Sequence, residues 1–283
     1  MNHLSWLRGP VLGLMLLPAG PVLAAEDLLY ETPQEQFETP QQKAQPSARG
    51  ALGTIRLDNW GYFQENINGT SQWQYRPRLF VPYVFTNEWV ATLRTDVPMF
   101  YTDNTGPANR DGGYSGGIGN IFFEPILDTA QVAPNLTLRT SLRFILKSPK
   151  GPPFGPDNQY QIAPGAGFTL RMPDVLHGVT FSPYFRWVRG FNGDEPGTQL
   201  ISTLQVIPAT TFRLDDRWSL ALYPENPITY NFNTKKWFAP LDLLLVHRAS
   251  QNLEFAFGGA TKVGDPSGAT YDYVINGRVT LFF

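Results

Sequence analysis

Arginines recur at alternate positions along stretches of this sequence whose intervening positions are apolar. In residues 136–147 the even positions carry Leu, Leu, Thr, Leu, Phe and Leu, while the odd positions carry Thr, Arg, Ser, Arg, Ile and Lys. A period of two places Arg139 and Arg143 on one face of a β-strand, whereas a helix would distribute these residues around its axis. The pattern predicts strands with one apolar face and one face that meets water and charge.

The polar faces of these strands hold the candidate functional residues. The alternation assigns to one wet interior the side chains Arg76, Arg78, Arg94, Asp96, Glu124, Arg139, Arg143, Arg171, Arg186 and Arg278. Basic residues outnumber acidic ones in this set, although the whole chain has a formal net charge of -2. In a narrow channel with low-dielectric walls, a basic excess focuses the field and favours anions. The alternative is that arginines and carboxylates form ion pairs that fill the interior.

The sequence offers little for catalysis. Beyond residue 24 the histidines are His177 and His247. A lipid hydrolase needs a base within hydrogen-bond reach of its nucleophile, and neither histidine is followed closely by a serine on the same face. Because a catalytic constellation can be assembled from distant residues, a barrel enzyme acting on membrane lipid stays an alternative. With 0 Cys and no cluster of metal-ligand spacing, we predict no metal and no cofactor.

Composition favours a membrane barrel over other classes. Charged residues make up 16% of the 283 residues, well below the roughly 25% of ordinary soluble domains. The mean hydropathy of -0.22 nevertheless does not fit a helical membrane protein. An aromatic-rich chain of this kind fits an alternation of lipid-facing and water-facing residues. The charge balance gives no reason to expect nucleic-acid binding.

The N-terminus has the features of an export signal. Arg8 precedes the apolar run 11–17, and small residues around Ala24 offer a cleavage site. We therefore predict a signal peptide over 1–24. Residues 25–52 are rich in Pro and Gln and predict a flexible, disordered periplasmic tail. The β-barrel is expected over 53–283.

The alternating stretches predict a transmembrane antiparallel β-barrel of about twelve strands. They are 54–65, 72–85, 89–101, 114–127, 136–147, 160–172, 179–191, 199–214, 218–225, 237–247, 253–262 and 271–283. If the C-terminus lies in the periplasm, the short connections become periplasmic turns, at 86–88, 128–135, 173–178, 215–217 and 248–252. The longer ones become outside loops, at 102–113, 148–159, 192–198, 225–236 and 263–270. Prolines inside several of these strands predict a bent, irregular barrel, because proline cannot donate to a ladder.

The final strand resembles the assembly signal of bacterial outer-membrane β-barrels. Residues of one parity are apolar up to a terminal aromatic: Tyr271, Tyr273, Ile275, Val279, Leu281 and Phe283. The resemblance implies that the barrel-insertion machinery reads this strand, and that the protein is a porin-like barrel of a Gram-negative outer membrane. The alternative is an ordinary amphipathic strand that is last in the chain and carries no assembly signal.

More loosely, the chain resembles the transporter-like family named for the meta pathway of phenol degradation. The shared cue is the Gly-rich strand start 116–121 after a long loop. That family commonly has Asp where this chain has Asn120, so the match covers only a few residues and implies no particular substrate.

These observations favour an outer-membrane channel or facilitator for small solutes, with a preference for anionic or aromatic ones. The expected partners are outer-membrane lipid, the barrel-insertion machinery and a small-molecule solute. The alternatives are the barrel enzyme and a structural or surface-recognition barrel with a plugged lumen. An open path lined by arginine would support the channel. A histidine–serine or acid–histidine cluster near the outer rim would support the enzyme, and a fully paired interior would support the plugged barrel.

Overall fold

The computed structural model describes residues 51–86, 89–106, 108–149, 154, 159–191, 199–263 and 271–283. The predicted signal peptide and the predicted tail up to residue 50 lie outside the described residues. Among those described, Ala51–Leu52 forms the short strand β1, which pairs with the end of β3. No described helix is long and apolar enough to cross a membrane.

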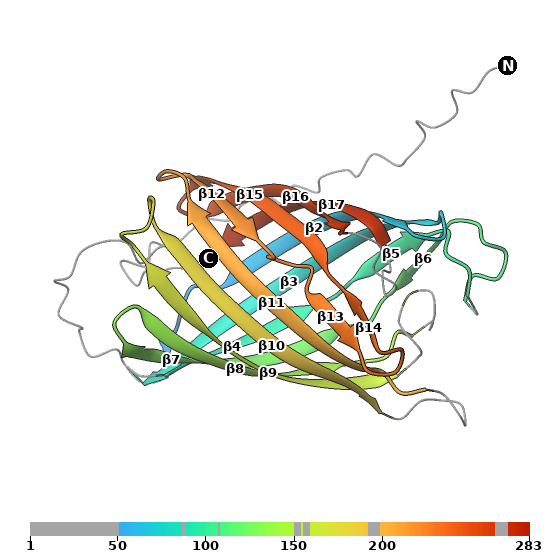
Figure 1. Ribbon diagram of the computed structural model, residues 1–283, viewed down its shortest axis with the longest axis horizontal. Coiled ribbons are helices and arrows are strands. Elements are labelled where there is room, and N and C mark those ends of the chain that lie inside the picture. The colour runs from blue at the N-terminus through green and yellow to red at the C-terminus, as the bar shows by residue number, and fades with distance from the viewer. Residues whose placement is uncertain are drawn as a thin grey trace, which may run out of the picture.

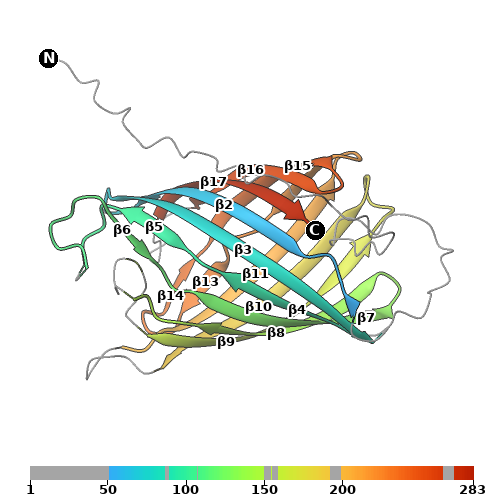
Figure 2. The ribbon, with the colours of Figure 1, turned by 180° about the vertical axis from the view of Figure 1, so that it is seen from behind.

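The described chain folds into one antiparallel sheet that closes into a barrel of twelve strands, as the sequence predicted. Closure is made by β17 and β2, which pair from Phe282 opposite Arg56 to Tyr271 opposite Asn66. Figures 1 and 2 show the tilted strands wrapping around one axis, with β5, β6, β13 and β14 toward one end and the C-terminus toward the other.

Four of the twelve strands are interrupted, so the sheet contains more segments than strands. The interrupted strands are β4/β5, β6/β7, β12/β13 and β14/β15, whose two parts pair with the same neighbours. The bounds are β2 Arg56–Asn66, β3 Ser71–Thr86, β4 Trp89–Asp96, β5 Met99–Thr102, β6 Ser115–Ile118, β7 Phe122–Ala133, β8 Leu136–Ile145, β9 Tyr160–Met172, β10 Val179–Phe191, β11 Ser202–Arg213, β12 Trp218–Leu222, β13 Ile228–Asn231, β14 Lys236–Phe238, β15 Pro240–Ser250, β16 Leu253–Lys262 and β17 Tyr271–Phe282.

Side chains alternate between an apolar outer face and a packed inner face. On β15, Leu243 and Leu245 are 37% and 40% exposed, whereas the intervening Leu244 is 1% exposed. Large apolar side chains stand outward in the same way on the other long strands. Apolar exposure on this scale marks a surface that meets lipid, because a water-soluble protein rarely leaves large apolar patches uncovered.

The prolines lie where pairing with one neighbour is interrupted. Pro77 on β3 faces the break between β4 and β5, where pairing stops at Asp96 and resumes at Met99. Pro208 on β11 faces the break between β12 and β13, and Pro183 on β10 lies in a gap of the pairing with β9. A residue without an N–H costs nothing where no ladder partner is present. The predicted irregular barrel is confirmed.

Two predicted connections are wrong. Strand β7 continues through the predicted periplasmic turn 128–135 to Ala133, and Asn135 with its φ of 61° makes a tight turn to β8. The predicted outside loop 225–236 contains strand β13 and the first residue of β14, which pair with each other and are joined by the turn 232–235. Strict alternation stops at each bulge and break, so periodicity placed the ends of these strands too early.

The described turns at the end of the barrel that holds the C-terminus are short, and the turn from β11 to β12 is stabilised by local hydrogen bonds. In the turn from β11 to β12, the backbone N–H groups of Arg217 and Trp218 donate to the Asp215 carboxylate at 2.7 and 2.8 Å. These two hydrogen bonds lower the pKa of Asp215. His247 stacks on Trp218 beside this turn, with ring centroids 4.3 Å apart.

One residue of the predicted assembly signal faces the other way. Tyr273 and Ile275 point outward, at 39% and 46% exposed, and Phe283 is 70% exposed. Tyr271 is instead 6% exposed and packs edge-on against Phe238 inside the barrel. The pairing register of β17 with β2 shifts between Tyr271 and Tyr273, which reverses the parity at that point. The expectation that Tyr271 shares the outer face is therefore wrong.

A charge on the outer face of β17 tests the lipid-facing belt. Ile275→Arg is expected to lower the free energy of unfolding from lipid by about 2–4 kcal/mol, the cost of arginine near the bilayer midplane. Tyr273→Arg, nearer the strand end, is the control and is expected to cost about 0–1 kcal/mol. Urea unfolding from phospholipid vesicles measures both. Equal effects of the two substitutions would contradict the assigned membrane depth.

Candidate functional site

A connected network of arginines and carboxylates crosses the interior of the barrel. Arg78 on β3 is 4% exposed, and its Nε donates to Asp96 Oδ2 at 2.9 Å. Its Nη1 and Nη2 donate to the two carboxylate oxygens of Glu225 at 2.6 and 2.7 Å. Arg94 on β4 donates to both oxygens of Asp96 at 2.8 and 2.9 Å. Arg76 Nη1 lies 3.7 Å from Glu225 Oε2. The predicted neighbours Arg76, Arg78 and Arg94 therefore do lie together.

Glu124 on β7 is the second centre of this network. Its side chain is 1% exposed and lies 2.7 Å from both Arg143 Nη2 and Arg186 Nη2. Arg94 Nη1 lies 3.7 Å away, which links Glu124 to the group around Arg78. Ser141 Oγ donates to Glu124 Oε1 at 2.7 Å. An isolated carboxylate buried this deeply would be very costly, so these partners are what permits it.

Aromatic rings alternate with the guanidinium groups along the inner wall. The Arg56 guanidinium lies 3.8 Å from the Phe80 ring centroid, and Arg94 lies 5.7 Å from the same ring. The Phe122 ring is next, 5.0 Å from Arg94 and 3.9 Å from Arg143. Cross-strand pairing places Arg56, Phe80 and Arg94 opposite one another on β2, β3 and β4. Each contact lies within the range of a cation–π interaction.

Glu225 was missed by the sequence analysis, which placed it at the start of an outside loop. It belongs to residues 223–227, which we call the inward segment, between β12 and β13. From there Glu225 reaches Arg78 on β3, although β15, β16, β17 and β2 separate the two strands around the wall. The contact therefore crosses the lumen. Pro224 and Pro227 were the available signal, because two prolines so close together rule out a continuous strand.

Asp242 on β15 holds the inward segment in place. Its Oδ2 accepts the backbone N–H groups of Glu225 and Asn226 at 3.0 and 2.7 Å. Its carbonyl oxygen accepts the N–H of Tyr223 at 2.9 Å. These bonds replace the ladder bonds that the strand break removes.

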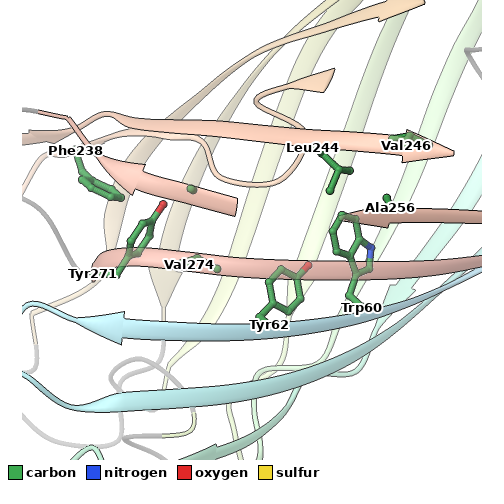
Figure 3. Close-up of a cluster of buried hydrophobic side chains, with 9 residues drawn as sticks. Trp60, Tyr62, Phe238, Leu244, Val246, Ala256, Tyr271 and Val274 are labelled. Carbon is green, nitrogen blue, oxygen red and sulfur yellow. The ribbon is translucent and has the colours of Figure 1, made fainter. Parts of the chain in front are cut away.

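An apolar cluster fills the lumen beside β2, β15, β16 and β17. Figure 3 shows its labelled side chains: Trp60, Tyr62, Phe238, Leu244, Val246, Ala256, Tyr271 and Val274. The rings of Trp60 and Tyr62 are stacked with centroids 5.5 Å apart. Arg78 lies over the Trp60 ring and Arg76 over the Tyr62 ring, at 5.4 and 4.7 Å. The cluster therefore borders the ion network directly.

Three predicted lumen residues lie apart from the two centres of the network. Arg139 on β8 pairs with Asp128, its Nε 2.7 Å from Oδ1, and is 38% exposed. Arg278 on β17 pairs with Glu254 on the neighbouring strand β16. Arg171 lies near the inner end of β9, with the same parity as the buried Thr169. All three have the inner-face parity that the sequence assigned to them. None of them belongs to the network around Arg78 and Glu124.

The Gly-rich stretch 116–119 makes room for aromatic side chains. A Cβ on Gly117 would lie 2.7 Å from the Phe154 ring, and one on Gly119 would lie 2.1 Å from Phe100 and 2.8 Å from the Phe154 carbonyl oxygen. Phe154 is 1% exposed. The sequence cue shared with the phenol-pathway family therefore has a local packing explanation here.

The described residues offer little for other chemistry. Within them, no group of three or more His, Asp or Glu side chains is placed to hold a metal ion. His177 is exposed in the turn after β9. Neither His177 nor His247 has a serine hydroxyl as a hydrogen-bond partner in this part of the chain.

A double-mutant cycle on Arg78 and Glu225 tests the contact across the lumen. Arg78→Gln is expected to lower the free energy of unfolding by about 3–5 kcal/mol, because it removes the bidentate partner of the buried Glu225 carboxylate. Adding Glu225→Gln is expected to cost less than the sum of the two single changes, with a coupling of about 0.5–3 kcal/mol. The more exposed pair Arg139 and Asp128 is the control, with a coupling below about 1 kcal/mol. Urea unfolding of all variants gives both couplings, and equal values would contradict a buried link.

Glycine-to-alanine changes test the packing of the Gly-rich stretch. Gly119→Ala is expected to lower the free energy of unfolding by about 1–3 kcal/mol, because the new methyl group meets backbone as well as ring atoms. Gly116→Ala is the control, since its nearest contact would be an ordinary 3.6 Å. Thermal melting followed by circular dichroism measures both. A Gly119→Ala barrel as stable as Gly116→Ala would show that Phe100 and Phe154 do not pack there.

Comparison with known proteins supports the fold. No family model matches the sequence, and no curated protein matches it. Among solved structures, the chain is similar to the COG4313 outer membrane channel from Pseudomonas putida F1, with a TM-score of 0.63, 10% identity, and coverage of 87% of this chain and 100% of that one. The β-domain of the Bordetella autotransporter BrkA gives a TM-score of 0.49 at 9% identity, covering 83% of this chain and 100% of that one. At 10% identity, the likeness to the channel structure shows a shared barrel fold.

Proposed function

We propose that this protein is an outer-membrane channel for small solutes that prefers anionic ones, with aromatic groups tolerated along its ring-lined wall. The observation that carries the proposal is a surplus of positive charge in the lumen network. Five guanidinium groups face three carboxylates, those of Arg76, Arg78, Arg94, Arg143 and Arg186 against Asp96, Glu124 and Glu225. A network that served only to fill space would be closer to neutral.

The charge surplus supports anion selectivity by simple electrostatics. Low-dielectric walls focus the field of fixed charges into the lumen and raise the local concentration of oppositely charged solutes. The rings of Phe80 and Phe122 lie between the cations and offer an apolar surface at the same depth. The apolar outer belt and the final strand support insertion into a Gram-negative outer membrane by the barrel-insertion machinery.

A plugged structural barrel is the second candidate, and one observation favours it. Arg78, Arg94 and Arg143 are all hydrogen-bonded to carboxylates, and the Arg78–Glu225 contact crosses the lumen beside a packed apolar cluster. Such pairing is what a filled interior requires. The two candidates differ in whether ions pass through the purified protein. For the barrel enzyme, the histidines contribute no supporting contact.

Neutralising Arg76 tests the channel proposal. Arg76 is the most exposed of the five arginines, at 25%, and its nearest carboxylate is 3.7 Å away, so its charge is the least compensated. Arg76→Gln is expected to lower the anion-over-cation permeability ratio in planar bilayers, most at low salt, where screening is weakest. Leu93→Ala on the outer face is the control and should leave selectivity unchanged. Wild-type protein that conducts no ions and admits no solute into liposomes would favour the plugged barrel.

A further inference from the structure

The lumen contains a pocket of donors that fits a carboxylate group. Arg78 presents Nη1 and Nη2 in parallel to the two oxygens of Glu225, at 2.6 and 2.7 Å. The Tyr62 hydroxyl donates to Glu225 Oε2 at 3.2 Å, and Arg76 lies 3.7 Å from that oxygen. Two parallel N–H···O bonds match a planar carboxylate, and a spherical anion cannot satisfy both in the same way.

The carboxylate that occupies these donors is held differently from the others in the network. Asp96 and Glu124 belong to β4 and β7, which pair with each other directly. Glu225 belongs to the inward segment, whose described backbone N–H donors at Tyr223, Glu225 and Asn226 all bind Asp242. The Glu225 side chain takes no part in these bonds, so its carboxylate can leave Arg78 while the backbone of the inward segment stays bound to Asp242.

We propose that Arg78, Arg76 and Tyr62 form a binding site for the carboxylate group of a small organic acid, which Glu225 occupies in this structure as an internal substitute. A solute carboxylate enters the site by displacing Glu225. One carboxylate replaces another, so Arg78 has a bidentate partner before and after the exchange. Arg76 is a quarter exposed and lies 3.7 Å from Glu225 Oε2, so its positive charge is close to both the entering and the leaving carboxylate.

The proposal rests on the proposed function in one respect, that solutes reach the lumen, and it names their chemical class. It also predicts weak binding by the resting protein. The apparent affinity for a solute is reduced by the fraction of molecules in which Glu225 has left the donors. Removing Glu225 should therefore expose the affinity of the site itself.

Acetate provides the test. The full-length barrel carrying Glu225→Ala is folded in detergent and titrated with sodium acetate, with sodium chloride at equal ionic strength and with acetamide as a neutral analogue. Acetate is expected to raise the melting temperature saturably, because it restores the partner that Arg78 has lost. Chloride and acetamide are expected to have no saturable effect. The matched control carries Arg78→Gln together with Glu225→Ala, which removes both partners, and should not respond to acetate.

If Glu225→Ala does not fold, Glu225→Gln gives the same test through equilibrium dialysis of radiolabelled acetate. Binding about tenfold or more tighter than that of wild type is expected, since the internal competitor has lost its charge. An acetate effect no larger than that of chloride, or an equal response of the double variant, would overturn the proposed site. Conductance is measured separately. If the protein binds acetate specifically but does not conduct, the proposed site stands and the proposed channel function fails. If the protein conducts but does not bind acetate specifically, only the proposed site fails.

Discussion

Inside a bilayer every backbone N–H and C=O group must find its partner within the protein, and this constraint governs the whole structure. A closed barrel satisfies it, but prolines cannot contribute their share of donors. The chain places Pro77, Pro183 and Pro208 where the ladder is already interrupted. At the break between β12 and β13 the freed N–H groups turn to Asp242. The break that removes ladder bonds is thus also what carries Glu225 across the lumen to Arg78.

The contents of the lumen argue that its charges do more than fill space. Buried ion pairs lose hydration, and well-packed apolar side chains of similar volume are often at least as stabilising. This chain uses such apolar packing beside β2, β15, β16 and β17, where Trp60, Leu244 and Val246 are almost completely buried. On the facing sector it keeps arginines instead, in excess over carboxylates. The proposed channel function accounts for this charged sector, because apolar side chains alone could have filled the space.

Much of the architecture was predictable because lipid and lumen impose opposite requirements on alternate residues. That period placed Arg76, Arg78 and Arg94 on one face and near one another, as the structure confirms. It failed at Tyr271, where a register shift reverses parity, and at residues 225–236, where a strand break mimics a loop. The partner of Arg78 was also out of reach, because Glu225 meets it only after the sheet closes. The local period of two does not predict contacts between strands that lie far apart around the barrel wall.

The position of Glu225 distinguishes it from the other acidic members of the network. Asp96 and Glu124 are 0% and 1% exposed and are carried by strands whose backbones are paired with each other. Glu225 places both of its carboxylate oxygens on Arg78 and is carried by a segment outside the strands. A channel that must be stable when empty and still admit an anion needs one removable counter-charge among fixed ones. Under the function and site proposed above, Glu225 is that group, and the anchoring of the inward segment on Asp242 limits how far its carboxylate can move.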